Sequence, residues 1–339
     1  MRRLWVFRSD IRQLEYYHKY KFGHEMKEHC HDFYLMMGFH YLEKDVFDEV
    51  TIWRLEPPDK KTDVEMLTSN GKKFIQRFVP NFEICALYPS PEISFFRGGF
   101  KEYCRVTQKI PKKFGIKLYC GTGKRVAPQY GGIYDKVLVE DQQDLDKYKD
   151  VIPFYKTATP SIFHPIEAKI KYDICWPANF TQATYKGQDF FISKVAKSKY
   201  LKNLRIIHLG NKPGVGRKLA RKHGVTNIEF VGWKERPQFN KILNQSKVGL
   251  CCSNRTDGCP RVVTEVLAAG TPLLTRNTTR LLDYYRQTKQ VLNFNDQNVE
   301  SRVKDAIDNF KVYKRKAKED LEHISMDRIC SRNIDLWRK

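Results

Sequence analysis

The sequence predicts an α/β protein with two doubly wound sheets of mostly parallel strands. From about residue 172 onward, short apolar runs alternate with stretches of helical periodicity, and the first half repeats this alternation less clearly. A strand, a helix and a strand at this spacing form a parallel βαβ unit, so open sheets covered on both faces are expected. The 339 residues suffice for two such domains at about 150 residues each.

The second half contains the clearer elements. Its expected strands are Tyr172–Trp176, Arg205–Gly210, Ile228–Gly232, Lys247–Cys252, Pro272–Thr275 and Gln290–Phe294. Its expected helices are Gln188–Leu201, Gly216–His223, Pro237–Asn244, Arg261–Ala269 and Thr279–Tyr285. Ligands of open parallel sheets bind beyond the carboxyl ends of the strands. We therefore expect two Rossmann-like domains facing a cleft in which the chemistry takes place.

The first half is expected to follow the same plan. Its expected strands are Leu4–Phe7, Glu49–Arg54, Ile93–Phe96, Ile116–Cys120 and Lys136–Glu140, and its expected helices are Lys27–Leu42 and Phe100–Ile110. The segment Pro153–Pro165 contains prolines and threonines that are typical of a linker. The expected domains are residues 1–160 on the acceptor side, residues 161–300 on the donor side, and a charged helical end, 301–339, that packs back on the first domain.

Basic residues are unevenly distributed along the chain. The net charge is +22, yet residues 1–100 contain as many acidic as basic side chains. Ten Lys or Arg and no acid lie between Lys194 and Lys222, and Lys101–Arg125 contains eight basic residues against Glu102 alone. One interpretation is solvated helix faces. The other is a polyanionic partner, either a nucleic acid or an anionic membrane surface.

The sequence also indicates the cellular compartment in which the protein is expected. No apolar run approaches the roughly 18 residues of a membrane span, and the start of the chain has too few apolar residues for a signal peptide. The nine cysteines form no CxxC pair, which disfavours a zinc knuckle or a disulfide framework. We expect a cytoplasmic protein, with peripheral attachment to the cytoplasmic face of a membrane as an alternative. The oligomeric state is not predicted.

The segment Ser253–Leu274 carries the strongest chemical signal. An expected strand ends in a loop containing Asp257 and Gly258, and a helix begins near Pro260, which suits a first helical turn. The first-turn amides of that helix have no intrahelical partner and favour a phosphate group. Glu265 follows one turn inside the helix, where a carboxylate is costly unless paired. The hydroxyls of a ribose would pair it, and so would a cap or a salt bridge within the sheet; both interpretations are open.

The residues Asp257-Gly258-Cys259-Pro260 and Glu265-Val266-Leu267-Ala268-Ala269-Gly270-Thr271-Pro272 resemble the donor-binding signature of glycosyltransferase family 4, E-G-x-P-x-x-x-x-E-A-x-A-x-G-x-P. The resemblance extends upstream to Asn227–Ser253, to Tyr185–Lys197 with its Lys-Gly pair, and to Phe163–Pro165. It covers about residues 160–295 and implies the two-domain GT-B fold.

The resemblance also implies the roles of single residues. Glu265 would hold the ribose hydroxyls, Asp257 would contact the transferred sugar, and Lys186 would neutralise the departing diphosphate; these three are the catalytic candidates. The base would lie at Gly232 and Trp233. The further donor-binding candidates are Arg255, Gly258, Cys259, Pro260, Arg261 and Val262.

Two departures from the family pattern stand out. The family has an Arg shortly before its Lys-Gly pair, whereas this chain has Asn179 and no Arg there, so that either Arg255 or Arg261 substitutes or the diphosphate is held less firmly. The Gly-Gly loop expected after the first strand is also missing, because Arg8 follows Phe7. Gly98 and Gly99 line the cleft in its place, or they belong to an ordinary loop. The acceptor-side candidates are Arg8, Arg97, Gly98 and Gly99.

The implied function is that of a glycosyltransferase, a transferase that moves a sugar from a UDP- or GDP-linked donor to an acceptor hydroxyl with retention of configuration. Such an enzyme holds the diphosphate with lysine, amides and a helix end, so no metal or other cofactor is expected. Two alternatives are a glycosyltransferase that acts on nucleic acid and a noncatalytic protein that binds sugar nucleotides or polyanions on the same scaffold.

Overall fold

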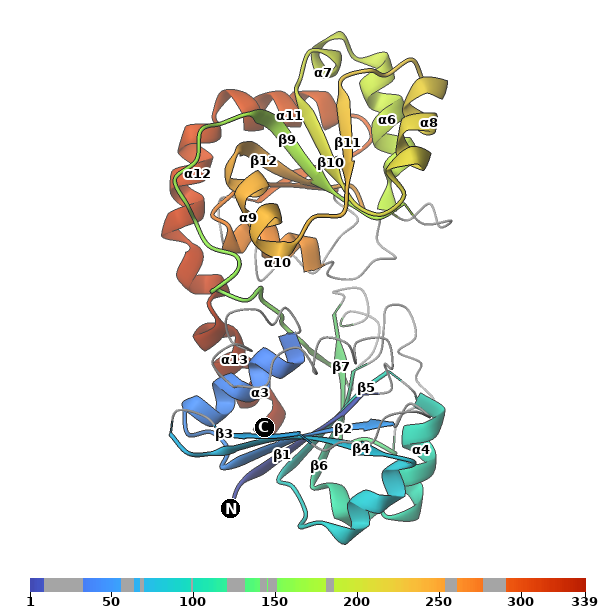
Figure 1. Ribbon diagram of the computed structural model, residues 1–339, viewed down its shortest axis with the longest axis vertical. Coiled ribbons are helices and arrows are strands. Elements are labelled where there is room, and N and C mark those ends of the chain that lie inside the picture. Colours follow the sequence, from blue (N-terminus) through green and yellow to red (C-terminus); the bar gives the residue numbers. More distant parts are fainter. Residues whose placement is uncertain are drawn as a thin grey trace. The chain divides into compact units, whose positions relative to one another are not determined.

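The chain divides into two compact units. The computed structural model describes residues 1–8, 33–55, 64–67, 70–98, 100–120, 132–140, 145, 151–180, 186–253, 261–276 and 291–339 (Figure 1). Unit 1 consists of Met1–Tyr155 and Ile329–Lys339, and unit 2 of Lys156–Arg328. The division therefore lies between Tyr155 and Lys156, whereas the sequence suggested 160/161.

Unit 1 is built on an eight-stranded sheet with the order β3-β4-β2-β1-β5-β6-β7-β8. Its strands are β1 (Arg3–Arg8), β2 (Glu49–Leu55), β3 (Val64–Leu67), β4 (Lys73–Val79), β5 (Ile93–Arg97), β6 (Ile116–Cys120), β7 (Lys136–Val139) and β8 (Val151–Pro153). All neighbours pair in parallel except β3, which runs antiparallel to β4. The predicted α/β class is therefore correct for this unit, although β3, β4 and β8 were not predicted.

Side chains of unit 1 alternate between the two faces of its sheet, as a pleated strand requires. Trp5 and Phe7 belong to an aromatic core together with residues of the short helices η2 (Phe82–Leu87) and η3 (Pro111–Phe114) and of α4 (Phe100–Lys109). Helix α3 (Phe33–Glu43) contacts β2 and β4. The expected helix began at Lys27, and residues 27–32 lie outside the described part of the chain.

The end of the chain completes unit 1. Helix α13 (Met326–Arg338) lies within the expected helical end, 301–339, and from Ile329 onward it belongs to this unit. The Tyr41 hydroxyl donates a hydrogen bond to the Cys330 carbonyl (2.9 Å), and Trp337 is fully buried against the rings of Tyr41 and Phe95. These contacts make the last helix part of the unit 1 core.

Unit 2 is a six-stranded parallel sheet with the order β11-β10-β9-β12-β13-β14. Its strands are β9 (Tyr172–Pro177), β10 (Ile206–Leu209), β11 (Ile228–Gly232), β12 (Ser246–Cys251), β13 (Leu273–Arg276) and β14 (Val291–Phe294). Counted from β9, this is the order 3-2-1-4-5-6 of a dinucleotide-binding sheet. Its six strands agree with the expected ones to within one residue at each end, which bears out the predicted fold class here too.

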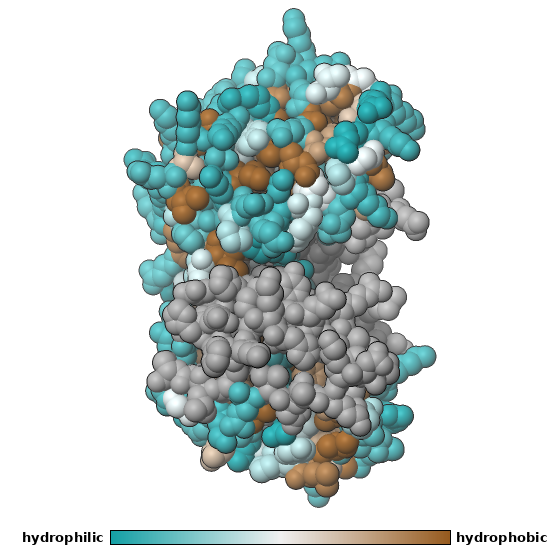
Figure 2. All heavy atoms as spheres, viewed as in Figure 1, coloured by the Kyte–Doolittle hydropathy of each residue, from teal (hydrophilic) through white to brown (hydrophobic). Residues whose placement is uncertain are grey.

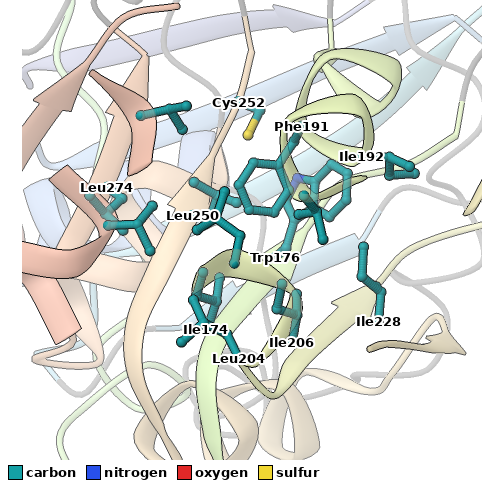
Figure 3. Packing of buried hydrophobic residues seen from close by; sticks show 14 of the residues in the cluster. Ile174, Trp176, Phe191, Ile192, Leu204, Ile206, Ile228, Leu250, Cys252 and Leu274 are labelled. Atoms are coloured by element: carbon teal, nitrogen blue, oxygen red, sulfur yellow. The ribbon is translucent and has the colours of Figure 1, made fainter. Parts of the chain in front are cut away.

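Helices cover both faces of the unit 2 sheet. They are α6 (Gln188–Lys197), α7 (Lys199–Lys202), α8 (Pro213–Lys222), α9 (Arg236–Asn244), α10 (Arg261–Ala268), α11 (Val299–Asp308) and α12 (Phe310–Glu319), followed by the short η8 (Leu321–Ile324). One core joins α6, α8 and α11 to the sheet around Ile174, Trp176 and Phe191 (Figure 3). A second core joins α9, α10 and η8 to the sheet.

The expected helix over Gln188–Leu201 is interrupted. Ser198 adopts an extended conformation, and its side chain accepts a hydrogen bond from the Leu201 amide (2.9 Å), which caps α7. The apolar periodicity continues through this break, so periodicity alone could not locate it. The expected helix Thr279–Tyr285 lies outside the described residues.

No helix in the described part of the chain is both long and apolar enough to cross a membrane.

Candidate functional site

A pocket of about 180 Å³ lies at the carboxyl edge of the unit 2 sheet. Its floor is formed where β9, β10 and β12 end, by Pro177–Asn179, Leu209 and Cys251–Ser253. The chain leaves β9 toward β10 and leaves β12 toward β13, in opposite directions along the sheet. The pocket therefore lies at the switch point where ligands of such sheets bind.

Lys186 reaches this pocket because of the glycine that follows it. Gly187 has φ +71°, and a Cβ there would lie 2.2 Å from the Cys252 carbonyl oxygen. Glycine is therefore required both for the left-handed conformation and for the close approach of the start of α6 to the end of β12. The Lys-Gly pair of the sequence thus places a cation on the pocket wall, as Lys186 lines it.

Helix α10 brings its first two turns to the same pocket. Arg261, Val262 and Glu265 line it, while Val263 and Val266 are buried in the core beneath. This packing fixes which face of α10 meets the pocket. The first-turn N–H groups have no intrahelical acceptor, so the pocket adjoins a helix end that favours anions.

Glu265 is paired with a residue that the sequence analysis did not select. Arg236 Nη1 lies 2.6 Å from Glu265 Oε1, and the two side chains are only 11% and 8% exposed. Both residues also line the pocket. The carboxylate is therefore salt-bridged within the domain and at the same time faces the space in which a ligand would lie.

No signal in the sequence selects Arg236. It is the first residue of α9, between the N-cap Glu235 and Pro237. A cation is unfavourable at a helix N-terminus, but the neighbouring Glu235 carboxylate offsets this effect, so the position alone does not indicate a distant anionic partner.

Trp233 provides an exposed ring beside the pair. It lies just after Gly232, the last residue of β11, which has φ +79°. Half of the Trp233 side chain is exposed, and the Arg236 guanidinium carbon lies 4.7 Å from the centroid of its ring. Trp233 lines the pocket, whereas Gly232 sets the turn that precedes it.

The described pocket lining is strongly cationic. Lys186, Lys234, Arg236 and Arg261 face a single carboxylate, that of Glu265. Such a lining attracts anionic ligands. Burial raises the pKa of the Cys252 thiol well above its usual value, so this lining residue is protonated and is a poor nucleophile.

The acceptor-side candidates lie together in unit 1. Arg8 and Arg97 end the neighbouring strands β1 and β5 in register. Their guanidinium carbons lie 4.7 and 5.3 Å from the centroid of the Tyr34 ring, and Arg97 Nη1 is 3.0 Å from Glu140 Oε1. Gly98 follows with φ +77°.

Several predicted residues lie outside the described part of the chain. In the second half they are Arg255, Asp257, Gly258, Cys259 and Pro260, and in the first half Gly99. Their roles stay predictions. Within the described residues, no group of three or more His, Cys, Asp or Glu is placed to hold a metal ion.

Comparison with protein families matches residues 171–309 to the family described as glycosyl transferases group 1. Comparison with the curated proteins finds no significant match in sequence. The family match lies within unit 2 and includes every residue of the pocket.

Solved structures share the fold of the whole chain. Sucrose-phosphate synthase from Thermosynechococcus elongatus has a TM-score of 0.67 and 12% identity, over 100% of this chain and 98% of that one. The E. coli trehalose-6-phosphate structure bound with UDP-2-fluoro glucose has a TM-score of 0.65 and 10% identity, with 99% of each chain covered. An α-glucosyltransferase in complex with UDP and a 13-mer DNA has a TM-score of 0.64 and 12% identity, again over 99% of each chain. These likenesses confirm the predicted fold class, two parallel-sheet α/β domains of the GT-B type, and the matched domain supports the prediction of a transferase enzyme.

Proposed function

We propose that this chain, whose residues 171–309 match glycosyl transferases group 1, moves a sugar from a nucleoside-diphosphate sugar to an acceptor hydroxyl, as family 4 enzymes do. The observation that supports this most directly is the pocket at the switch point of unit 2. Its buried carboxylate suits the hydroxyls of a ribose. Its cationic wall and its helix N-terminus suit a diphosphate and the negative charge that develops on it.

Each described residue has a task in this proposal. Glu265 accepts hydrogen bonds from the ribose hydroxyls through its carboxylate. Trp233 offers its exposed face to the base, since stacking on an aromatic ring suits any base. Lys186 and the first-turn amides of α10 bind the diphosphate. Asp257 is proposed to contact the transferred sugar.

The proposed reaction retains the configuration at the anomeric carbon. The bond from that carbon to the acceptor oxygen forms on the face from which the diphosphate leaves, and the leaving phosphate oxygen takes the acceptor proton. Lys186 and the α10 amides stabilise the negative charge that develops on the leaving group. Preorganised groups of this kind typically contribute about 3–4 kcal/mol each.

We propose further that no metal is needed for this step, because the cationic side chains and the helix end supply the positive charge. The sequence contains an Asp-x-Asp pattern at Asp144 and Asp146, two residues outside the described part of the chain. Activity assayed with EDTA and with added Mg²⁺ or Mn²⁺ tests this point. Loss of activity in EDTA that Mg²⁺ or Mn²⁺ restores would contradict it.

In the first experiment, UDP- and GDP-sugars are titrated into the protein and their binding is measured by calorimetry. A separate assay measures the sugar that is released. UDP-sugars come first because two structures with this fold are described with a UDP compound. We expect binding of one nucleotide class and slow release of sugar without acceptor. Glu265→Gln is expected to lower donor affinity about 10- to 100-fold, because a charged hydrogen-bond acceptor is lost. Unchanged affinity in this variant would contradict the assignment of Glu265.

A nucleic-acid acceptor is the second candidate, and a specific surface favours it. Helix α8 and the turn before it expose Lys212, Arg217, Lys218, Arg221 and Lys222. The part of unit 2 around α8 is largely hydrophilic in Figure 2. The α-glucosyltransferase with a similar fold was solved with DNA. We propose that this basic helix binds a polyanion, and its binding to DNA or RNA would fall steeply with salt.

Two controls separate these proposals. If nucleic acid binds but stays unmodified when donor sugar is supplied, the nucleic-acid acceptor is excluded. If donors bind and no sugar is ever released or transferred, the chain is a noncatalytic sugar-nucleotide-binding protein.

A further inference from the structure

The Arg236–Glu265 pair has an unusual position for a salt bridge. Arg236 is the first residue of α9, and Glu265 lies in the second turn of α10. The two side chains meet at the wall of the pocket. Their closest N and O atoms are 2.6 Å apart, and about nine-tenths of each side chain is buried. A guanidinium does not lose its proton, so a permanent positive charge is held at this wall.

Stability alone gives little reason for such a pair. Desolvation of two buried charges offsets most of their attraction, and apolar residues of similar volume often stabilise a protein as well or better. Arg236 in addition lies at a helix N-terminus, where the dipole disfavours a cation. A buried pair of low net benefit, placed on the lining of a pocket, points to a role in ligand binding.

We propose that Arg236 is a positioning residue with two contacts: it orients the Glu265 carboxylate toward the ribose and binds the donor diphosphate with another edge of its guanidinium. The inference rests on the proposed function and adds to it the source of selectivity for diphosphates.

The chemistry of arginine supports both contacts at once. Its five N–H groups form a planar fork, a geometry with which one guanidinium can bond both a carboxylate and a phosphate. The Trp233 ring lies under the guanidinium, at 4.7 Å, and holds its plane. Lys186, a point charge with a flexible stem, lines the same pocket as a further cation.

The two contacts predict different effects on different ligands. Orientation of Glu265 matters for every ligand that carries a ribose, including a nucleoside without phosphates. A contact with the diphosphate matters only for nucleotides. Arg236 is therefore expected to make the pocket distinguish a nucleoside diphosphate from its nucleoside, and a lysine in its place would retain the charge but lose the fork.

A double-mutant cycle tests this separation. The variants are Arg236→Gln, Arg236→Lys, Glu265→Gln and the double variant Arg236→Gln/Glu265→Gln, each titrated with UDP, GDP, uridine and guanosine in competition format. The double variant removes both buried charges, so it folds even if Arg236→Gln alone leaves Glu265 unpaired and destabilises the protein; thermal unfolding of each variant checks this.

In the Glu265→Gln background, Arg236→Gln is expected to weaken nucleoside-diphosphate binding by about tenfold or more. The diphosphate measured is UDP or GDP, whichever the wild type binds. The affinity for the matching nucleoside should not change in that background, because the carboxylate that Arg236 orients is already gone. Arg236→Lys in the wild-type background should recover only part of the diphosphate affinity. Lys241→Gln is the matched control, since Lys241 is exposed on the same helix and its loss removes the same charge.

Equal losses for nucleoside and diphosphate, or no loss at all in the Glu265→Gln background, would overturn the diphosphate contact. Full recovery by lysine would overturn the role of the planar fork. A wild-type protein that binds neither UDP nor GDP would instead overturn the proposed function itself, so the two failures are distinguishable.

Discussion

Each unit holds an Arg–Glu pair over an aromatic ring at the carboxyl edge of its sheet, and the two pairs differ in one respect. In unit 1, Arg97 pairs with Glu140 at 3.0 Å and lies over Tyr34, whose side chain is 7% exposed. In unit 2, Arg236 pairs with Glu265 at 2.6 Å and lies over Trp233, which is 50% exposed. The same arrangement therefore lies against a buried ring in one unit and lines a pocket in the other.

The surroundings explain this difference. The Arg97 guanidinium also contacts the Cys120 sulfur at 2.9 Å, next to the buried residues of β1 and β5. Arg236 lines the pocket at which the chain leaves β9 and β12 in opposite directions. Residue type and strand-end position are alike in both places, so exposure of the ring and the presence of a pocket indicate which pair meets a ligand.

The largest expected effects are on the free energy of unfolding and on nucleotide affinity, which together distinguish the Arg97–Glu140 pair from the Arg236–Glu265 pair. Glu140→Gln should lower the free energy of unfolding by about 3–5 kcal/mol, because it removes one partner of a buried pair. Nucleotide affinity should stay unchanged. Glu265→Gln should also lower stability, since it too removes one partner of a buried pair, and it should in addition lower nucleotide affinity. Chemical denaturation and calorimetry of both variants measure this, and a nucleotide-binding defect in Glu140→Gln would break the comparison.

The aromatic rings should differ in the same way. Trp233→Ala is expected to weaken nucleotide binding by about 1–3 kcal/mol, the usual range for a base stacked on an aromatic ring. Val312→Ala is the control, because Val312 is a large exposed apolar residue of the same unit outside the pocket lining. If the two variants bind nucleotide alike, Trp233 does not contact the base.

Mild acid should destabilise unit 2 through one buried histidine. Burial lowers the pKa of His208 to about 3, from an unfolded value near 6.5, and this residue is fully buried in unit 2. Between these values the unfolded chain binds one more proton than the folded chain, so stability falls as pH decreases from 6.5 toward 3, by up to about 1.4 kcal/mol per unit. His208→Phe should remove this slope. Unfolding curves at pH 7, 6 and 5 measure it, and an unchanged slope in the variant would refute the role of His208.

The smallest effects should be alike in the two units. Ser198 caps α7 in unit 2, and the Asn81 side chain accepts from the Glu83 amide (3.0 Å) at the start of η2 in unit 1. Replacing either by alanine should lower stability by about 1 kcal/mol, as loss of an N-cap usually does. Neither change should alter nucleotide affinity; a change in the Ser198 variant would mean that α7 communicates with the pocket.

Much of unit 2 could be predicted from sequence because its strands are short apolar runs bounded by helices of clear periodicity. Unit 1 was harder, since β4 contains Gln76 and Arg77 within its span and β8 has only three residues. Helix α13 was expected only as part of a charged helical end, 301–339, and its separate start after η8 was not located.

The site was predictable where a local signal existed. The Lys-Gly pair and the α10 segment each placed a residue, Lys186 and Glu265, that lines the pocket. Arg236 was missed because its partner lies 29 residues away in sequence, and only the fold brings the two together. Pairing between helices is a tertiary property, so the sequence showed that Glu265 needed a partner without showing which residue supplies it.

The course of the chain has a consequence for its synthesis. Unit 2 is one continuous stretch, whereas the core of unit 1 includes Trp337 and the carbonyl of Cys330, which follow all of unit 2. On the ribosome, the pocket-bearing unit has its whole sequence available while the unit that emerges first still lacks α13. Unit 1 therefore completes its core only after all of unit 2 has been synthesised.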